Sequence, residues 1–205
     1  MRILFQGDSI TDANRGGDPE GMGYGYPKYA TELLRKYFAE QGIEVECINK
    51  GISGNRAESL VERWQKDAID IKPDIISILI GINDTWHRAG ERNWMPNSYF
   101  ESCYRVILQQ IKDRVGAKII ILEQFLLDAP DKEFFRVDLD PKIQITRKLA
   151  REYADAFIPL DGLFAQAALD HEPFYFSGDG VHPNENGSRF IAELYLDAVK
   201  KVLAK

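Results

Sequence analysis

The sequence predicts an α/β fold, a three-layer α/β/α sandwich in which helices cover both faces of a parallel sheet. Strand-like and helix-like patterns alternate from one end of the chain to the other, which is typical of βα units. Residues 74–80 are apolar at nearly every position, as in a strand covered on both faces. The length of 205 residues suits one domain, so we expect residues 1–205 to form a single unit.

The first half of the chain supplies three of the expected strands. Residues 2–6 form a short apolar strand, and a helix follows at 26–41, with a proline in its first turn. Residues 44–48 alternate apolar and acidic side chains, as a second strand would. A helix pattern at 57–67 then leads to the third strand at 74–80.

The second half continues the alternation and brings the sheet to five parallel strands. The helix at 98–115 has the clearest pattern, because its apolar side chains follow a spacing of 3.6 residues: Phe100, Cys103, Tyr104, Ile107, Leu108, Ile111 and Val115. Two more strands and three more helices follow, with strands at 118–123 and 156–160 and helices near 140–154, 162–169 and 185–203.

Three long loops, at residues 11–25, 85–96 and 125–138, each follow an expected strand. In open α/β sheets, ligands bind outside the carboxyl ends of the strands. We therefore expect these loops to form the rim of the functional site.

Composition argues against nucleic acid and membrane partners. The net charge is −6, whereas binders of phosphate backbones usually present a basic face. No apolar run approaches the roughly 20 residues of a membrane-spanning helix, and no secretory signal follows Met1-Arg2. We therefore expect a cytoplasmic location, and in that reducing compartment we expect Cys47 and Cys103 to be buried free thiols.

A candidate nucleophile, Ser9, lies in the Gly7-Asp8-Ser9-Ile10-Thr11 segment that follows the first strand. Gly7 permits a tight exit from the sheet. A serine hydroxyl becomes an effective nucleophile when a base takes its proton. Taken alone, the segment is equally consistent with a turn or a helix cap.

A candidate base, His182, lies in the Asp179-Gly180-Val181-His182-Pro183 segment before the last helix. A carboxylate three residues before an imidazole can bind Nδ1–H, which fixes the tautomer and leaves Nε2 free as a base. The alternative is that both residues only cap the last helix. Of the other histidines, we expect His171 to be solvated, and His87, which follows Asn83-Asp84, to line the site.

Two further segments offer hydrogen-bond donors for a negatively charged oxygen. Gly54, in the glycine-rich segment 49–55 after the second strand, offers a backbone N–H. Asn83, after the third strand, offers an uncharged amide. Each segment by itself is also consistent with an ordinary turn or a helix cap.

The order Ser9, Gly54, Asn83 and His182, each near a strand end or in the last loop, resembles the GDSL/SGNH hydrolase family, whose name lists these four blocks. The resemblance covers nearly the whole chain, and Ile10 in place of leucine is its one departure in these blocks. It implies a flavodoxin-like sandwich. It also implies Ser9 as nucleophile, His182 as base with Asp179 as its orienting group, and an oxyanion hole formed by the N–H groups of Ser9 and Gly54 and the Asn83 side chain. No metal or organic cofactor is implied.

The choice of substrate depends on a narrower resemblance, to the acetyl-xylan esterase branch. Residues 49–55, Arg63-Trp64, Asp67, 72–74 and 81–86 carry it. The expected rim is also aromatic and polar, which suits a sugar ring: Tyr24, Tyr26, Arg56, Trp86, Trp94, Tyr175 and Phe176. We expect the substrate to be a small ester, an acetylated xylo-oligosaccharide, contacted by Asp8, Asn55, Arg56, Trp86 and Tyr175.

Two alternative functions stay open, one within the same family and one from another class of protein. A short-chain lipase, lysophospholipase or thioesterase would use the same groups, and a catalytically silent relative would bind acetylated glycans without cleaving them. The acetyl-xylan esterase branch suggests a homo-oligomer. Trp94-Met95-Pro96 would then be an exposed contact between subunits, or else a lid over the site.

Overall fold

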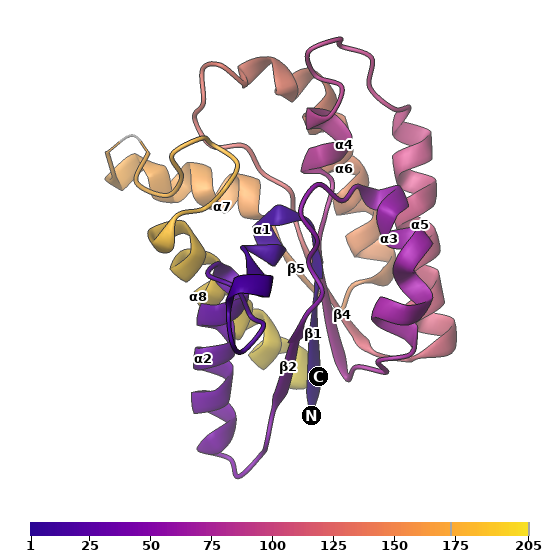
Figure 1. Cartoon of the computed structure of the whole chain (residues 1–205), viewed down its shortest axis with the longest axis vertical. Helices are drawn as coiled ribbons and strands as arrows, with labels where there is room; N and C mark the ends of the chain where they lie inside the picture. Colours follow the sequence, from indigo (N-terminus) through magenta and orange to yellow (C-terminus); the bar gives the residue numbers. More distant parts are fainter. Residues whose placement is uncertain (173, 205) are drawn as a thin grey trace.

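Five parallel strands form one sheet, in the order β2-β1-β3-β4-β5, in the computed structural model, which describes residues 1–172 and 174–204 (Figure 1). The strands are β1 (Arg2–Gly7), β2 (Glu46–Asn49), β3 (Ile75–Leu79), β4 (Lys118–Leu122) and β5 (Ala156–Ile158). The strand order reverses at β1, which pairs with both β2 and β3. This reversal is where ligands bind in open α/β sheets, so the segments after β1 and β3 are placed for function.

Helices cover both faces of this sheet, as the sequence predicts. They are α1 (Ser9–Asp12), α2 (Tyr26–Ala39), α3 (Ala57–Trp64), α4 (Ile82–Trp86), α5 (Asn97–Arg114), α6 (Arg136–Tyr153), α7 (Leu160–Ala167) and α8 (Glu185–Leu203). Figure 1 shows α2, α7 and α8 on one side of the sheet and α3, α5 and α6 on the other. The short helices α1 and α4 lie at the carboxyl ends of β1 and β3.

Alternating side chains of each strand enter two separate cores. Ile3 and Phe5 of β1 pack with the layer of α2 and α8, while Leu4 packs with the layer of α3 and α5. Ile75 and Ile76 of β3 divide in the same way. Because successive side chains of a strand point to opposite faces, a sheet buried on both sides must be apolar throughout.

The boundaries differ from the predictions in places. β2 begins at Glu46, two residues later than expected. α6 begins at Arg136, four residues early, with Pro141 inside it. Pro141 is exposed there, so the backbone hydrogen bond that it cannot make is lost next to solvent. The sequence left α1 and α4 open as turns or helix caps, because segments of four and five residues contain too little periodicity to reveal a helix.

The two cysteines are free, as expected, and Cys103 is buried. Cys47 is only partly buried, which corrects the expectation for that residue. Within residues 1–172 and 174–204, every helix is too short or too polar to span a bilayer. The cytoplasmic location stays a prediction.

Candidate active site

Ser9 is the first residue of α1, directly beyond the end of β1. The chain leaves the sheet at Gly7, where a Cβ atom would lie 2.3 Å from Thr11 Oγ1 and 2.4 Å from the Leu79 carbonyl oxygen. Asp8 then caps the helix, because its Oδ1 accepts the Ile10 N–H at 3.0 Å. The cap ends the strand abruptly and leaves Ser9 partly exposed at the carboxyl edge of the sheet.

His182 and Asp179 complete a hydrogen-bonded chain with Ser9. His182 Nε2 lies 2.9 Å from Ser9 Oγ, and His182 Nδ1 lies 2.7 Å from Asp179 Oδ2. These distances join two segments that are 173 residues apart in sequence. The structure therefore brings together the three residues expected to form a catalytic triad, with the geometry that proton transfer from serine to histidine requires.

Asp179 is oriented by its own loop. Its Oδ1 accepts the N–H groups of Val181 at 2.9 Å and His182 at 2.7 Å, and Ser177 Oγ lies 3.1 Å away. Burial alone would raise the pKa of Asp179. Hydrogen bonds from the His182 ring and from the backbone of His182 and Val181 outweigh burial and hold the pKa at about 2. The carboxylate is therefore ionised at neutral pH.

The two expected oxyanion donors lie next to each other. Asn83, in α4, donates one N–H of its side-chain amide to the Asn55 carbonyl at 3.1 Å, and its second N–H has no partner within residues 1–172 and 174–204. Gly54, the residue before Asn55, has φ of +82°, a conformation that favours glycine. The Asn83 amide is thus held against the turn that carries the Gly54 N–H.

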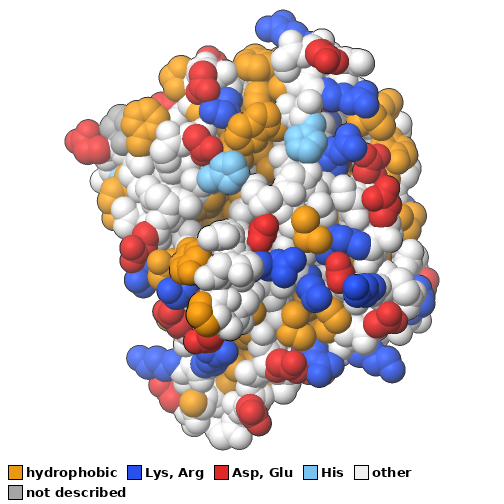
Figure 2. Space-filling view, viewed as in Figure 1, with side chains coloured by type: hydrophobic (Ala, Val, Ile, Leu, Met, Phe, Trp, Pro, Cys, Tyr) orange, Lys and Arg blue, Asp and Glu red, His pale blue; other side chains and the backbone are white. Residues whose placement is uncertain are grey.

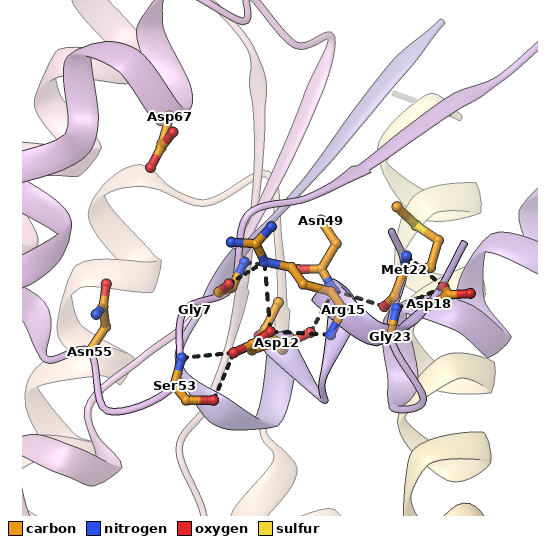
Figure 3. Close-up of polar contacts among 12 residues, drawn as sticks. Gly7, Asp12, Arg15, Asp18, Met22, Gly23, Asn49, Ser53, Asn55 and Asp67 are labelled. Carbon is orange, nitrogen blue, oxygen red and sulfur yellow. Dashed lines mark hydrogen bonds and ion pairs between the residues drawn. The ribbon is translucent and has the colours of Figure 1, made fainter. Parts of the chain in front are cut away.

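The turn before Gly54 is attached to the nucleophile helix by a polar network (Figure 3). The Asp12 carboxylate accepts the Ser53 N–H at 3.0 Å and the Ser53 hydroxyl at 2.7 Å. Arg15 Nε donates to the Gly51 carbonyl at 2.6 Å. Because these bonds join α1 and the turn Arg15–Gly17 that follows it to residues 51–53, the segments of Ser9 and Gly54 are fixed relative to each other.

Two buried carboxyl groups lie beneath the site. Burial and, less strongly, the charge of Asp84 raise the pKa of Asp8 to about 7, against the bond from the Ile10 N–H. Burial likewise raises the pKa of Asp84 to about 7, although its oxygens accept the Ala57 N–H. Among the residues that the structure describes, Asp8 Oδ2 has no hydrogen-bond partner. Near neutral pH the two groups thus hold protons that a solvated carboxylate would have lost.

The expected substrate contacts divide into surface and buried residues. The Trp86 ring lies 5.7 Å from the His182 ring, so it borders the expected base. Arg56 pairs with Glu58, and Asn55 is bonded to Arg63. Tyr175 stacks on the exposed His171 ring at 3.8 Å. All four are at least partly accessible.

Three aromatic or substrate expectations are wrong. Asp8 is 1% exposed and caps α1, so it lies beneath the site and not on its surface. Tyr26 and Phe176, expected at the rim, are buried in the core with α2 and α8. Trp94, also expected at the rim, is partly buried and so keeps some accessible surface, and its indole N–H donates to the Thr85 carbonyl at 2.9 Å.

His87 borders the oxyanion donors, as its position after Asn83 suggested. Its Cε1 atom would lie 3.9 Å from a Cβ at Gly54. Partial burial and the Arg56 charge lower the pKa of His87, which favours the neutral ring.

In the space-filling view, two histidine side chains lie on either side of a group of hydrophobic side chains (Figure 2). No group of three or more His, Cys, Asp or Glu is arranged to hold a metal ion among the residues that the structure describes.

Ser177 and Arg63 are the site residues whose functions the sequence does not reveal. Ser177 is buried, and its hydroxyl lies 2.8 Å from the His182 carbonyl as well as near Asp179. Its place two residues before Asp179 is the only local signal for it. Arg63 is one of the residues on which the resemblance to the acetyl-xylan esterase branch rests. The sequence does not show that it contacts Gly7 and Asn55, because these contacts depend on the fold.

The fold and this constellation are those of a serine hydrolase built on a three-layer α/β/α sandwich, with a serine, a histidine and an aspartate hydrogen-bonded in a chain at the carboxyl edge of a parallel sheet. A comparison with family models agrees, because residues 5–190 match the GDSL-like lipase/acylhydrolase family. The chain belongs to that family and is a GDSL esterase related to acetylxylan esterase.

Two relatives illustrate the match. An acetylxylan esterase of Geobacillus stearothermophilus is 33% identical over 95% of this chain and 92% of its own length. An arylesterase of Vibrio mimicus is 26% identical over 91% of this chain and 87% of its own.

Solved structures share the fold. A GDSL-like lipase of Parabacteroides merdae superposes with a TM-score of 0.89 at 31% identity, covering 98% of this chain and 95% of that chain. The acetylxylan esterase Axe2 of Geobacillus stearothermophilus gives 0.84 at 29% identity, covering 98% and 93%. The flavodoxin-like SGNH sandwich expected from the sequence is therefore confirmed.

Proposed function

We propose that this chain is a serine esterase that removes acetyl groups from carbohydrates, and that its substrates are acetylated xylo-oligosaccharides. The observation that carries the proposal is the chain of contacts from Ser9 Oγ through His182 to Asp179, at 2.9 and 2.7 Å. A Ser–His–Asp arrangement of this kind performs acyl transfer on several unrelated folds.

The first step forms an acyl-enzyme. His182 Nε2 takes the Ser9 proton as Oγ attacks the ester carbonyl carbon, and the carbonyl oxygen becomes an oxyanion. The C–O bond to the sugar then breaks, and His182 returns the proton to the leaving sugar hydroxyl. In the second step His182 takes a proton from water as the water oxygen attacks the acetyl carbon. The bond from that carbon to Ser9 Oγ then breaks, His182 returns the proton to Oγ, and acetate is released.

The oxyanion would be stabilised by three donors, namely the N–H groups of Ser9 and Gly54 and the free N–H of Asn83. Such donors act strongly because they are already in place when charge develops. The bond from Asn83 to the Asn55 carbonyl supports this role, because it fixes the amide before substrate arrives.

The choice of a sugar substrate is supported by two findings. The Trp86 ring lies beside His182, where a flat aromatic face suits a sugar ring. The related proteins of Geobacillus stearothermophilus are named acetylxylan esterase and acetyl-xylooligosaccharide esterase. Arg56, Asn55 and Tyr175 would supply polar contacts with the sugar hydroxyls.

The test is a deacetylation screen on acetylated xylo-oligosaccharides and peracetylated xylose, beside p-nitrophenyl esters of increasing acyl length. We expect turnover of the sugar acetates, a steep fall in activity beyond short acyl chains, and loss of turnover in Ser9→Ala. Near-normal turnover by purified Ser9→Ala would overturn the assignment of the nucleophile. A preference for acyl groups of about eight or more carbons would indicate a lipase or thioesterase instead.

Aryl acetates are a second candidate substrate class, favoured by the similarity to an arylesterase. The ratio of kcat/KM for a sugar acetate to that for phenyl acetate separates the two. We expect the sugar acetate to be preferred, and Trp86→Ala to lower that ratio.

A fluorophosphonate probe that fails to label Ser9, together with binding of acetylated glycans without turnover, would indicate a silent binding protein.

A further inference from the structure

The Arg63 side chain connects three parts of the molecule that converge beneath the oxyanion donors. Its Nε donates to Asn55 Oδ1 at 2.8 Å, its Nη2 to the Gly7 carbonyl at 3.3 Å, and its Nη1 to Asp67 Oδ2 at 3.2 Å. The side chain is 14% exposed, so it lies under the surface of the site.

Two of these contacts involve residues next to proposed catalytic groups. Gly7 is the last residue of β1, two residues before Ser9. Asn55 follows Gly54, and its carbonyl accepts the Asn83 amide at 3.1 Å. One guanidinium therefore holds the end of the nucleophile strand and the turn that carries the Gly54 donor and binds the Asn83 amide.

Asp67 is the third partner of the Arg63 guanidinium. It lies in the π-helical turn Gln65–Ile69 that follows α3, and such turns are frequent at functional sites. Gln6 Nε2 donates to the Asp67 carbonyl at 2.6 Å, and Lys50 Nζ lies 3.6 Å from its Oδ1. In the view of Figure 3, Asn55 and Asp67 lie on one side of Gly7, and Asp12 lies on the other.

We propose that Arg63 is a positioning residue for the oxyanion hole: it fixes the Gly54–Asn55 turn, and through it the Asn83 amide, relative to Ser9. The inference rests on the proposed function, since it assigns a task within the same reaction. Arginine suits this task because its planar fork reaches several acceptors in fixed directions, whereas a lysine ammonium is a point charge on a flexible stem.

The expected signature is a loss of kcat with KM nearly unchanged. The oxyanion exists only in the transition state, so misplaced donors affect turnover more than substrate binding. A misplacement of about 1 Å costs on the order of 100-fold in rate, so we expect Arg63→Met to lower kcat by about 10- to 100-fold. Arg63→Lys should lower kcat nearly as much, because it keeps the charge and loses the fork.

A double-mutant cycle with Asn83→Ala separates positioning from general stability. In the Asn83→Ala background one of the oxyanion donors is already missing, so a displaced turn can misplace fewer donors. Arg63→Met should therefore lower kcat by less than about threefold in that background. Arg2→Met is the matched control, because Arg2 also bonds a carboxylate, Glu46, and a backbone carbonyl, that of Ile71, at the opposite end of the sheet. Its kcat should equal that of the wild type.

The inference fails if Arg63→Met and Arg63→Lys turn over like the wild type, if only KM rises, or if the loss is the same with and without Asn83. The stability of each variant is measured by urea unfolding, so that a loss of kcat can be separated from a loss of the fold. If Arg63→Met does not fold, Arg63→Lys and Asn55→Ala replace it, since the latter removes the side-chain amide whose Oδ1 accepts the Arg63 Nε–H and keeps the main-chain carbonyl that binds Asn83. Their kcat losses should be non-additive with each other, and fully additive losses would also overturn the inference.

The outcome is distinguishable from failure of the proposed function. If Ser9→Ala keeps activity, the serine mechanism itself is wrong. If Ser9→Ala and Asn83→Ala both lose activity while the Arg63 variants keep it, the mechanism stands and only the task assigned to Arg63 is wrong.

Discussion

The nucleophile and its base are held in place by different kinds of structure. The segments of Ser9, Gly54 and Asn83 follow three adjacent strands, and the polar residues beneath them, such as Asp8 and Asp84, are buried. The side chains of Asp179 and His182 are 38% and 45% exposed, on a loop that precedes α8. The sheet thus positions the nucleophile half of the site, while bonds within one loop position the base half.

The nucleophile half and the base half should therefore respond differently to mutation. The base half depends on a few bonds between neighbours in sequence, such as those from the backbone of Val181 and His182 to Asp179. Its loss should affect activity with little effect on stability. The nucleophile half shares its residues with the core, so changes there should also alter folding.

The largest effect is expected from Asp179→Asn, which tests the base half. Asn Oδ1 can still accept the Val181 and His182 N–H groups, so the loop should stay folded. The new amide would donate to His182 Nδ1 and force the proton onto Nε2, which then cannot accept the Ser9 proton. We expect kcat to fall on the order of 10⁴-fold, measured on an acetylated sugar at pH 7.

The urea midpoint of Asp179→Asn should fall only modestly at pH 7: the ionised carboxylate, with its lowered pKa, stabilises the folded state, but it is partly exposed and the amide keeps the two backbone bonds. The pKa of Asp179 is about 2, so the wild-type carboxylate is ionised at pH 7 and the comparison is between one charged and one neutral acceptor. A large loss of stability would contradict the contrast, because it would mean that the fold depends on this loop.

The base half was readable from sequence because its partners are close together. Asp179 and His182 are three residues apart, and one turn suffices to bring them into contact. The strands and long helices were also predicted, because buried faces impose a periodicity on several residues. Neither inference required knowledge of distant contacts.

The supports of the nucleophile half were not readable, because they join distant residues. Arg63 and Gly7 are 56 residues apart, and no local pattern selects that pair. The rim was mispredicted at Tyr26 and Phe176 because a single aromatic residue near a loop carries no periodicity to give its direction. Asp8 was mispredicted for a related reason: an aspartate beside a nucleophile suits both a cap and a contact, and only its burial decides.

A smaller effect, with a pH signature, is expected from Asp8→Asn in the nucleophile half. Burial raises the pKa of Asp8 from 3.8 to about 7, so between these values the folded state keeps a proton that the unfolded state has lost. Raising the pH therefore favours unfolding, at about 1.4 kcal/mol for each pH unit within this window. Asp8→Asn removes this penalty, so its stability relative to the wild type should rise from about pH 4 to about pH 7 and then level off.

Urea unfolding across that pH range measures the difference, and Asp18→Asn is a control with a different pH window. Burial would raise the pKa of Asp18, but bonds from the N–H groups of Met22, Glu20 and Gly23 outweigh it and lower the pKa. Its carboxylate therefore stabilises the folded state fully above the unfolded pKa of 3.8, so the loss in Asp18→Asn should stay constant from about pH 5 to about pH 7 and shrink only as the pH falls below about 4. A pH-independent Asp8→Asn difference would refute the protonated form of Asp8.

The smallest effect is expected from Ser177→Ala, which probes how few bonds the base half needs. The buried Ser177 hydroxyl lies 3.1 Å from Asp179 Oδ1 and 2.8 Å from the His182 carbonyl, and its one proton serves one of them at a time. Its loss removes about 1 kcal/mol of hydrogen bonding. Asp179 keeps its two backbone donors, so kcat should fall by less than about tenfold. Ser102→Ala, which removes a hydroxyl bonded to the Ser98 carbonyl on α5, should change nothing. A loss near that of Asp179→Asn would show instead that the loop depends on this buried hydroxyl, and that its backbone bonds alone do not hold the base.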